Sequence, residues 1–179
     1  MAEILRYDTN SGGGMSKTAH EYSARIVWDG NTGKGTAAYD GYGRQYRVLI
    51  AGKPDLAGTA DAAFRGEPQK HNPEDLFLTA ISSCHLLSYL ALCARRGIVV
   101  LAYEDDAWGR MVPSTNGGGK FEEVVLRPRV TIADEKDRDT ALQMHDAAHE
   151  LCYIANSCSV PIRHEATIET RDRPGGRSR

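Results

Sequence analysis

The sequence of 179 residues lacks the features that would place a protein in a membrane, outside the cell or on nucleic acid. No uninterrupted apolar run reaches the roughly 18 residues of a membrane-spanning helix, and the first residues lack the charged and apolar segments of a secretion signal. A net charge of −2 gives no electrostatic basis for binding nucleic acid or an anionic membrane. Four cysteines are too few for a disulfide scaffold. We therefore expect a cytoplasmic protein whose thiols are free, metal-bound or catalytic.

The remaining composition, with 41% hydrophobic and 26% charged residues, is that of an ordinary globular domain. We predict one folded domain over residues 19–170, a flexible extension over 1–18 and a frayed basic tail over 171–179. The periodicity and turn signals predict an α+β fold with mainly antiparallel sheets. The predicted order is three strands (19–28, 35–39 and 45–50), an irregular stretch over 51–72 with a short helix near 61–64, a long helix over 73–96, a bent strand over 98–112, a strand over 121–132, a helix ending near Cys152, and a strand over 162–169.

The long helix has the clearest boundaries. Asn72 is a typical cap, Pro73 suits the first turn, and Glu74 complements the helix dipole. Gly97 then follows two arginines, as is usual just past a helix end. Apolar residues point in every direction around this helix, so it must be surrounded by protein. Since one small lobe can hardly cover its length, we expect a dimer with this helix at its centre.

The four cysteines differ in what their positions allow. Cys84 and Cys93 are nine residues apart on the long helix, so about 13 Å of rise and half a turn separate them and exclude a disulfide. Cys93 is best explained as a small buried hydrophobe. The useful pairing for Cys84 is therefore tertiary, with Cys152 or with Cys158.

A reactive cysteine works as a thiolate, whereas a free thiol with a pKa near 8.5 is mostly protonated at neutral pH. Because Cys84 lies too far inside its helix to benefit from the dipole, we expect a nearby cation and a carboxylate that orients it. Arg65 and Glu74 are the candidates, although each also has an ordinary interpretation as a surface charge or a first-turn residue. Ten residues, about 15 Å of rise, separate Glu74 from Cys84, so the two cannot touch within one straight helix. We expect Glu74 to serve the Cys84 of the partner subunit, or to act only through a mobile arginine.

Two other chemistries are weaker hypotheses. His145, His149 and Cys152 share one helical face with a spacing that suits metal ligands, but no fourth ligand is adjacent in the sequence. A Cys–His hydrolase would need a nucleophile elbow or an oxyanion loop, and neither is recognisable.

The segments Asn72-Pro73-Glu74-Asp75-Leu76-Phe77, Ser83-Cys84-His85 and Ala148-His149-Glu150-Leu151-Cys152 closely resemble the OsmC/Ohr family of osmotically inducible and organic hydroperoxide resistance proteins. The resemblance covers about residues 19–170. It implies an intertwined α+β homodimer with sites at the subunit interface and thiol-dependent reduction of peroxides without a cofactor. Cys84 matches the cysteine that attacks the peroxide, Cys152 the resolving cysteine, and Glu74 the family's glutamate.

The sequence departs from the hydroperoxide-resistance branch at two places. Cys152 is followed by Tyr153-Ile154-Ala155 instead of Pro-Tyr-Ser, and the turn over 29–34 lacks the arginine of that branch. The resemblance is therefore to a less characterised branch, and we assign the arginine role to Arg65. The expected partners are a second copy of the chain, a small peroxide, and a dithiol or redoxin reductant. The alternatives are a metal-binding or a non-catalytic dimeric protein.

Overall fold

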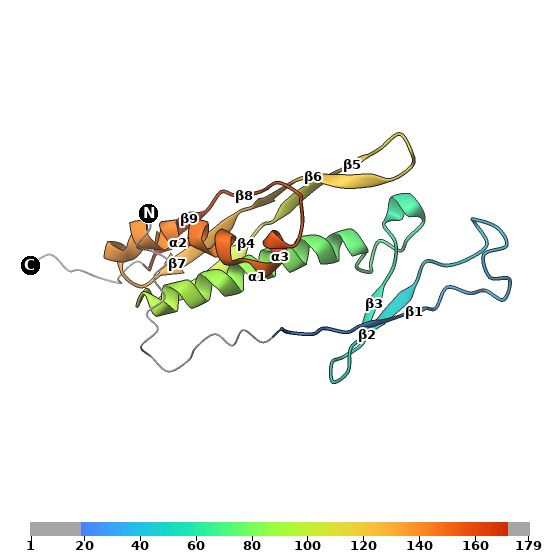
Figure 1. The fold of residues 1–179 in the computed structure, drawn as a ribbon, viewed down its shortest axis with the longest axis horizontal. Helices are drawn as coiled ribbons and strands as arrows, with labels where there is room; N and C mark the ends of the chain where they lie inside the picture. The colour runs from blue at the N-terminus through green and yellow to red at the C-terminus, as the bar shows by residue number, and fades with distance from the viewer. Residues whose placement is uncertain (1–18, 172–179) are drawn as a thin grey trace, which may run out of the picture.

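A computed structural model of the chain describes residues 19–171, and these form three small sheets and a long helix (Figure 1). The expected extension over 1–18 and nearly all of the expected tail over 171–179 lie outside the described residues. Mixed helices and mainly antiparallel sheets confirm the predicted α+β class.

The N-terminal sheet contains β1 (Arg25–Trp28), β2 (Tyr46–Leu49) and β3 (Leu56–Gly58), paired antiparallel in that order. Two of the three expected strands are confirmed, but the strand expected over 35–39 is wrong, because those residues belong to a long loop between β1 and β2. Its place is taken by β3, inside the stretch expected to be irregular. The short helix expected near 61–64 is confirmed as the 3₁₀ turn η1 (Ala62–Phe64).

This sheet has one apolar face. Residues directly opposite each other in neighbouring strands point to the same side, so the register places two cross-strand rows on one face. The other face carries Arg47, which forms ion pairs with Asp29 and Asp55 at 2.7 and 3.6 Å. In Figure 1 the sheet lies beyond the N-terminal end of the long helix, away from the other two sheets. The apolar face contains Ile26, Trp28, Tyr46, Val48 and Leu56.

The predicted long helix is confirmed as α1 (Pro73–Arg95). The side chain of Asn72 accepts a hydrogen bond from the backbone of Asp75, and the carboxylate of Asp75 accepts one from the backbone of Asn72 in return. At the other end, Gly97 takes a left-handed conformation with φ of 73°. The cap residues therefore set both ends of the helix where the sequence places them.

By length and composition alone, α1 could cross a membrane, although no uninterrupted apolar run in the sequence suggests this. In the fold, however, the helix packs against α2 (Arg138–Leu151) and buries Ile81, His85, Tyr89 and Cys93. The core helix of a globular protein meets the same length and composition criteria. On the uncovered side of α1, Leu87 remains 66% exposed within one chain.

The second half of the chain forms three long strands, and each breaks where it passes from one sheet to the other. The predicted bent strand is β4 (Val100–Asp105) and β5 (Trp108–Pro113), and the next is β6 (Gly119–Leu126) and β7 (Pro128–Ile132). The expected final strand is likewise split into β8 (Ile162–His164) and β9 (Thr167–Thr170). The resulting sheets have the orders β4-β7-β9 and β5-β6-β8, with β8 and β9 pairing parallel to their neighbours.

Side-chain and backbone hydrogen bonds hold these breaks in line. The carboxylate of Asp105 accepts from the backbone of Arg127 at 2.7 Å and from the hydroxyl of Ser82 on α1 at 2.5 Å. The backbone N–H of Glu165 donates to the carbonyl of Leu126 at 2.8 Å. Asp105 therefore ties the bend in the sheet to the middle of α1, close to Cys84 in sequence.

Two apolar clusters lie beneath α1, and Cys84 lies between them along the helix. One cluster is centred on Ile81 with Val124 and Leu126. The larger one contains Tyr89, Cys93, Ile98, Val130, Ile132, Ala141, Met144, Ala148 and Ile168. After the 3₁₀ turn η2 (Glu135–Asp137), α2 lies beside α1 and is followed by the single turn α3 (Tyr153–Asn156).

Candidate functional site

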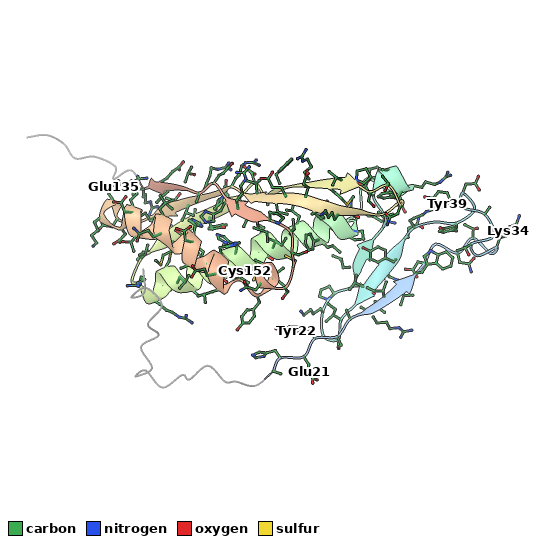
Figure 2. All side chains as sticks on the ribbon, turned by 45° about the horizontal axis from the view of Figure 1, so that its top comes forward. Glu21, Tyr22, Lys34, Tyr39, Glu135 and Cys152 are labelled. Carbon is green, nitrogen blue, oxygen red and sulfur yellow. The ribbon has the colours of Figure 1, made fainter. Side chains whose placement is uncertain are left out.

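The structure brings together the two cysteines that the sequence singles out. Burial raises the pKa of the Cys152 thiol to about 11, and the hydrogen bond of this thiol with Cys84 acts in the same direction. Cys84 is half-buried, Cys152 is 1% exposed, and both are reduced. Figure 2 shows Cys152 on the α2–α3 segment beside α1. Of the two tertiary pairings left open by the sequence, the structure shows an interaction between the thiols for the one with Cys152.

Cys152 occupies the junction of two helices. It is the C-terminal cap of α2 and the N-terminal cap of α3, with extended backbone angles between them. Its sulfur accepts a hydrogen bond from the backbone N–H of Ala155 at 3.4 Å, and the N–H groups of α3 oppose the rise in its pKa. The start of a helix favours a negatively charged sulfur. The site therefore combines a buried thiol with donors that can stabilise its thiolate.

The other two cysteines are placed differently. Cys93 is fully buried beside Tyr89, burial raises its pKa, and its expected role as a small buried hydrophobe is confirmed. Cys158 is half-buried, and its thiol donates to the carbonyl of Ala155 at 3.4 Å. It lines a groove of about 470 Å³ together with Phe77, Lys120, Phe121, Glu122, Ser159, Val160 and Pro161.

Glu74 lies in the first turn of α1, as expected, and one of its carboxylate oxygens is buried without a hydrogen-bond partner within residues 19–171. It lies close to Tyr46 on β2, where burial first and the charge of Glu74 second raise the pKa of the tyrosine hydroxyl. A buried carboxylate oxygen without a donor is costly. Glu74 is therefore a candidate to receive a cation from outside the single chain.

Arg65 is exposed and caps the turn η1 with a left-handed φ of 68°. Within residues 19–171, no hydrogen bond or ion pair joins Arg65 to Glu74. The arrangement inferred from the sequence, an arginine oriented by Glu74, is thus not assembled within one chain.

A second arginine, missed by the sequence reasoning, lies in the β1–β2 loop. The guanidinium of Arg44 stacks over Tyr42 at 4.0 Å and over Tyr39 at 4.6 Å, and donates to both of their backbone carbonyls. The loop closes through a hydrogen bond from Gly43 to Gly30 at 2.8 Å, beside the turn where the arginine of the related branch was expected. The spacing Tyr39, Tyr42, Arg44 was the available signal.

The histidines expected as alternative metal ligands do not form a metal-binding group with Cys152 among the described residues. His145 is buried and faces His85 on α1, whereas His149 is only partly buried. In the part of the chain that the structure describes, no three or more His, Cys, Asp or Glu side chains are grouped to hold a metal ion. Sequence reasoning missed His85, although His85, Tyr89 and Cys93 repeat every four residues along an otherwise apolar helix.

The comparisons with known proteins agree with this architecture. Residues 66–166 match the family of OsmC-like proteins. An OsmC-like protein of unknown function from Vibrio cholerae is similar over 83% of this chain and all of its own, with 28% identity and a TM-score of 0.75. Two organic hydroperoxide resistance proteins share the fold. The one from Elizabethkingia anophelis has 18% identity and a TM-score of 0.63 over 87% of this chain and 99% of its own. The one from Bacillus subtilis has 20% identity and a TM-score of 0.54 over 82% of this chain and 98% of its own. No curated protein matches the sequence.

Proposed function

Because the chain belongs to the OsmC-like protein family, we propose that it is a thiol-dependent peroxidase that reduces organic hydroperoxides. The observation that carries this proposal is the contact between Cys84, half-buried on α1, and Cys152, buried at the α2–α3 junction. Two reduced thiols in contact, one reachable and one enclosed, suit attack by the first and resolution by the second.

In the proposed reaction, the Cys84 thiolate attacks the O–O bond of the hydroperoxide. The sulfur becomes a sulfenic acid, and the other oxygen leaves as the alcohol. The thiol of Cys152 then attacks the oxidised sulfur, forms a disulfide with Cys84 and releases water. A small dithiol or a redoxin restores both thiols by exchange.

Cys152 is suited to the second step by its position. At neutral pH its raised pKa keeps it as a thiol, so that it does not compete for the peroxide. When the sulfenic acid forms next to it, the N–H of Ala155 is in place to stabilise the thiolate that attacks. Cys152 therefore remains a protonated, unreactive thiol until Cys84 has been oxidised.

We propose that the working unit is a homodimer in the cytoplasm, in which the site is completed across the interface. The apolar face of the N-terminal sheet supports this, because Ile26 and Trp28 are 61% and 42% exposed in one chain. The unpartnered oxygen of Glu74 supports it as well. In the dimer, Arg65 would stabilise the thiolate and the departing alkoxide, and Glu74 would orient Arg65.

The preference for organic hydroperoxides is supported by the groove beside Cys158. Its lining residue Phe77 is seven residues before Cys84, and hence on the same face of α1, and its ring packs against Phe121 with centroids 5.0 Å apart. An aromatic groove favours the apolar part of an organic hydroperoxide over hydrogen peroxide.

The experiment is a single turnover of the reduced protein with one equivalent of cumene hydroperoxide, followed by titration of the remaining thiols. We expect the wild type to lose both thiols of the Cys84–Cys152 pair rapidly, Cys84→Ser to lose none, and Cys93→Ser to match the wild type. Reaction of Cys84 no faster than that of a free thiol in solution would indicate a non-catalytic dimeric protein instead.

A further inference from the structure

Two histidines are buried against each other between α1 and α2, the two helices that also carry Cys84 and the cap residue Cys152. His85 is 1% exposed and His145 is fully buried. The Nε2 atom of His85 lies 3.0 Å from Nδ1 of His145, and the two rings are nearly parallel, with an angle of 7° between them. The ring of Tyr89 stacks on His145 with centroids 4.0 Å apart. The pair is therefore held in one geometry by packing and by a hydrogen bond.

The outer nitrogen of each ring has no partner. Nδ1 of His85 and Nε2 of His145 are buried without a hydrogen bond among the described residues, as is the hydroxyl of Tyr103 on β4. Buried polar atoms are normally paired, because an unpaired one destabilises the fold. Two core histidines with unpaired outer nitrogens therefore destabilise the fold more than apolar side chains in the same places would, so packing alone does not explain them.

Both rings are neutral at neutral pH. Burial first, and neighbouring histidines second, lower the pKa of His85 to about 4 and that of His145 to about 3. A neutral imidazole has one N–H donor and one acceptor nitrogen, so the hydrogen bond between the rings can run in either direction. The two tautomeric arrangements interchange when one proton crosses the hydrogen bond between the rings. At the same time the outer nitrogen of one ring gains a proton and the outer nitrogen of the other ring loses one.

A third histidine next to the pair offers a path toward solvent. His164 on β8 has ring centroids 5.8 Å from His85 and 5.7 Å from His145, and it is partly exposed. Its Nε2 lies 3.2 Å from the carboxylate of Asp146, which is 78% exposed. The titratable groups around the pair are Tyr89 on α1, Tyr103 on β4, His149 on α2 and His164 on β8.

The proposed reaction can make use of such a path. When Cys84 reacts as a thiolate, its oxidation with Cys152 and one hydroperoxide consumes one proton in total. The thiol of Cys152 supplies the second proton that water and the alcohol need. Restoration of both thiols by a dithiol, with Cys84 returning to its thiolate, releases one proton again. Each cycle therefore moves one proton into the site and one out of it.

We propose that His85 and His145 form a proton relay that serves the Cys84–Cys152 pair. This inference rests on the proposed peroxidase function. His85 follows Cys84 directly on α1, and His145 lies on α2, the helix that Cys152 caps, so each histidine shares an element with one of the thiols. The relay holds one tautomeric arrangement in the reduced protein and the opposite one in the oxidised protein, and the return of the proton resets it. The two histidines position protons and do not touch the peroxide.

The first test compares tautomers by long-range ¹H–¹⁵N NMR of the imidazole nitrogens, in protein reduced with a dithiol and in protein whose disulfide is made with diamide. We expect His85 and His145 to exchange their protonated nitrogens between the two states. The same tautomers in both states would overturn the relay. Because diamide forms the disulfide without a peroxide, this result is independent of peroxidase activity.

The second test uses His85→Gln and His145→Asn, which place an amide near the bonded nitrogen but cannot pass a proton. His20→Asn, at an exposed histidine, is the matched control. Single-turnover disulfide formation with cumene hydroperoxide is followed by stopped flow, in H₂O and D₂O and across pH. We expect both relay variants to be slower by about 10²-fold, to change the pH profile, and to recover partly with added imidazole.

Wild-type rates and isotope effects in the folded relay variants would contradict the proposal. A uniform loss of rate that keeps the pH profile and resists imidazole would do so as well, because it would indicate a structural role. If either variant fails to fold, the tautomer comparison on the wild type decides. If the wild type forms no disulfide with hydroperoxide, the peroxidase proposal fails instead, and the tautomer comparison still decides the relay.

Discussion

Two regions of the molecule differ in how far their apolar surfaces are buried. One is the N-terminal sheet, and the other is the body formed by α1, α2 and the two broken sheets. In the body, Tyr89, Met144 and Val130 are fully enclosed by the same chain. In the sheet, the face that contains Ile26 and Trp28 is open, and Figure 2 shows its loop reaching Tyr39 at the end of the molecule farthest from Cys152. The body therefore holds its thiol pair alone, whereas the open face of the sheet would be covered only in the proposed dimer.

The largest effect should come from breaking the sheet while leaving the body intact. In Ile26→Asp, each subunit loses about 2 kcal/mol of apolar burial, and a two-fold interface counts this twice. We expect the dissociation constant of the dimer to rise by about a thousandfold. Sedimentation at several protein concentrations measures it. Arg25→Asp, on the same strand but the opposite face, is the control. An unchanged dimer in Ile26→Asp would place the interface elsewhere.

The next largest effect concerns the buried histidines of the body. Because the folded-state pKa values of His85 and His145 lie below the usual 6.5, the unfolded chain binds more protons in acid. The free energy of unfolding is therefore at its full value above pH 6.5. It falls as the pH drops from 6.5 to about 4 because of His85, and further to about 3 because of His145. The loss is about 3 kcal/mol for His85 alone.

Urea denaturation at pH 7 and pH 4.5 measures this loss. Replacing both histidines by His85→Gln with His145→Asn should flatten the pH dependence. His20→Asn should leave it unchanged. An equally steep loss of stability in the double variant would assign the acid sensitivity to other groups.

A smaller effect should show how the two regions cooperate. Arg65→Ala should lower the single-turnover rate by about tenfold, since charge-assisted hydrogen bonds contribute about 1.5–3 kcal/mol, and Arg65→Lys should restore part of it. Arg44→Ala is the informative comparison, because its guanidinium is already engaged by Tyr39 and Tyr42. A greater loss in Arg44→Ala than in Arg65→Ala would transfer the role to Arg44.

These two regions also differ in how far the sequence predicts them. Local signals fixed α1, because Asn72, Pro73 and Gly97 act on the backbone next to them. The strand expected over 35–39 failed because Gly35 bonds back to the side chain of Asn31 and Tyr39 packs on Arg44, so that neither pairs with a neighbouring strand. The breaks within the three long strands depend on Asp105 meeting Arg127 and Ser82, contacts between residues far apart in the chain.

In the candidate site, the sequence predicted the residues of the thiol pair but not its surroundings. The spacing of Cys84 and Cys93 excluded a disulfide between them, Cys158 stayed open as an alternative, and the resemblance matched Cys152 to the resolving cysteine. His85 was overlooked because its partner, His145, lies 60 residues away, and only the packing of α1 on α2 brings them together. The pairing of Arg65 with Glu74 remains a prediction that a structure of the dimer would test.

The smallest effect is expected at Cys93. Cys93→Ala removes a buried sulfur from the larger apolar cluster, at a cost of about 1 kcal/mol in the free energy of unfolding. The single-turnover rate should remain that of the wild type, since Cys93 is on the opposite face of α1 from Cys84. Urea denaturation and stopped flow on the same preparation measure both quantities. A loss of peroxide reactivity in this variant would mean that a third thiol takes part.

The central claim, that Cys84 is oxidised and Cys152 resolves it, is tested most directly by peptide mapping of the wild-type protein after one equivalent of cumene hydroperoxide. The account predicts recovery of Cys84 linked to Cys152 within one chain, with Cys93 and Cys158 still free. Recovery of Cys84 linked to Cys158, or of a stable sulfenic acid at Cys84 beside a free Cys152, would contradict it.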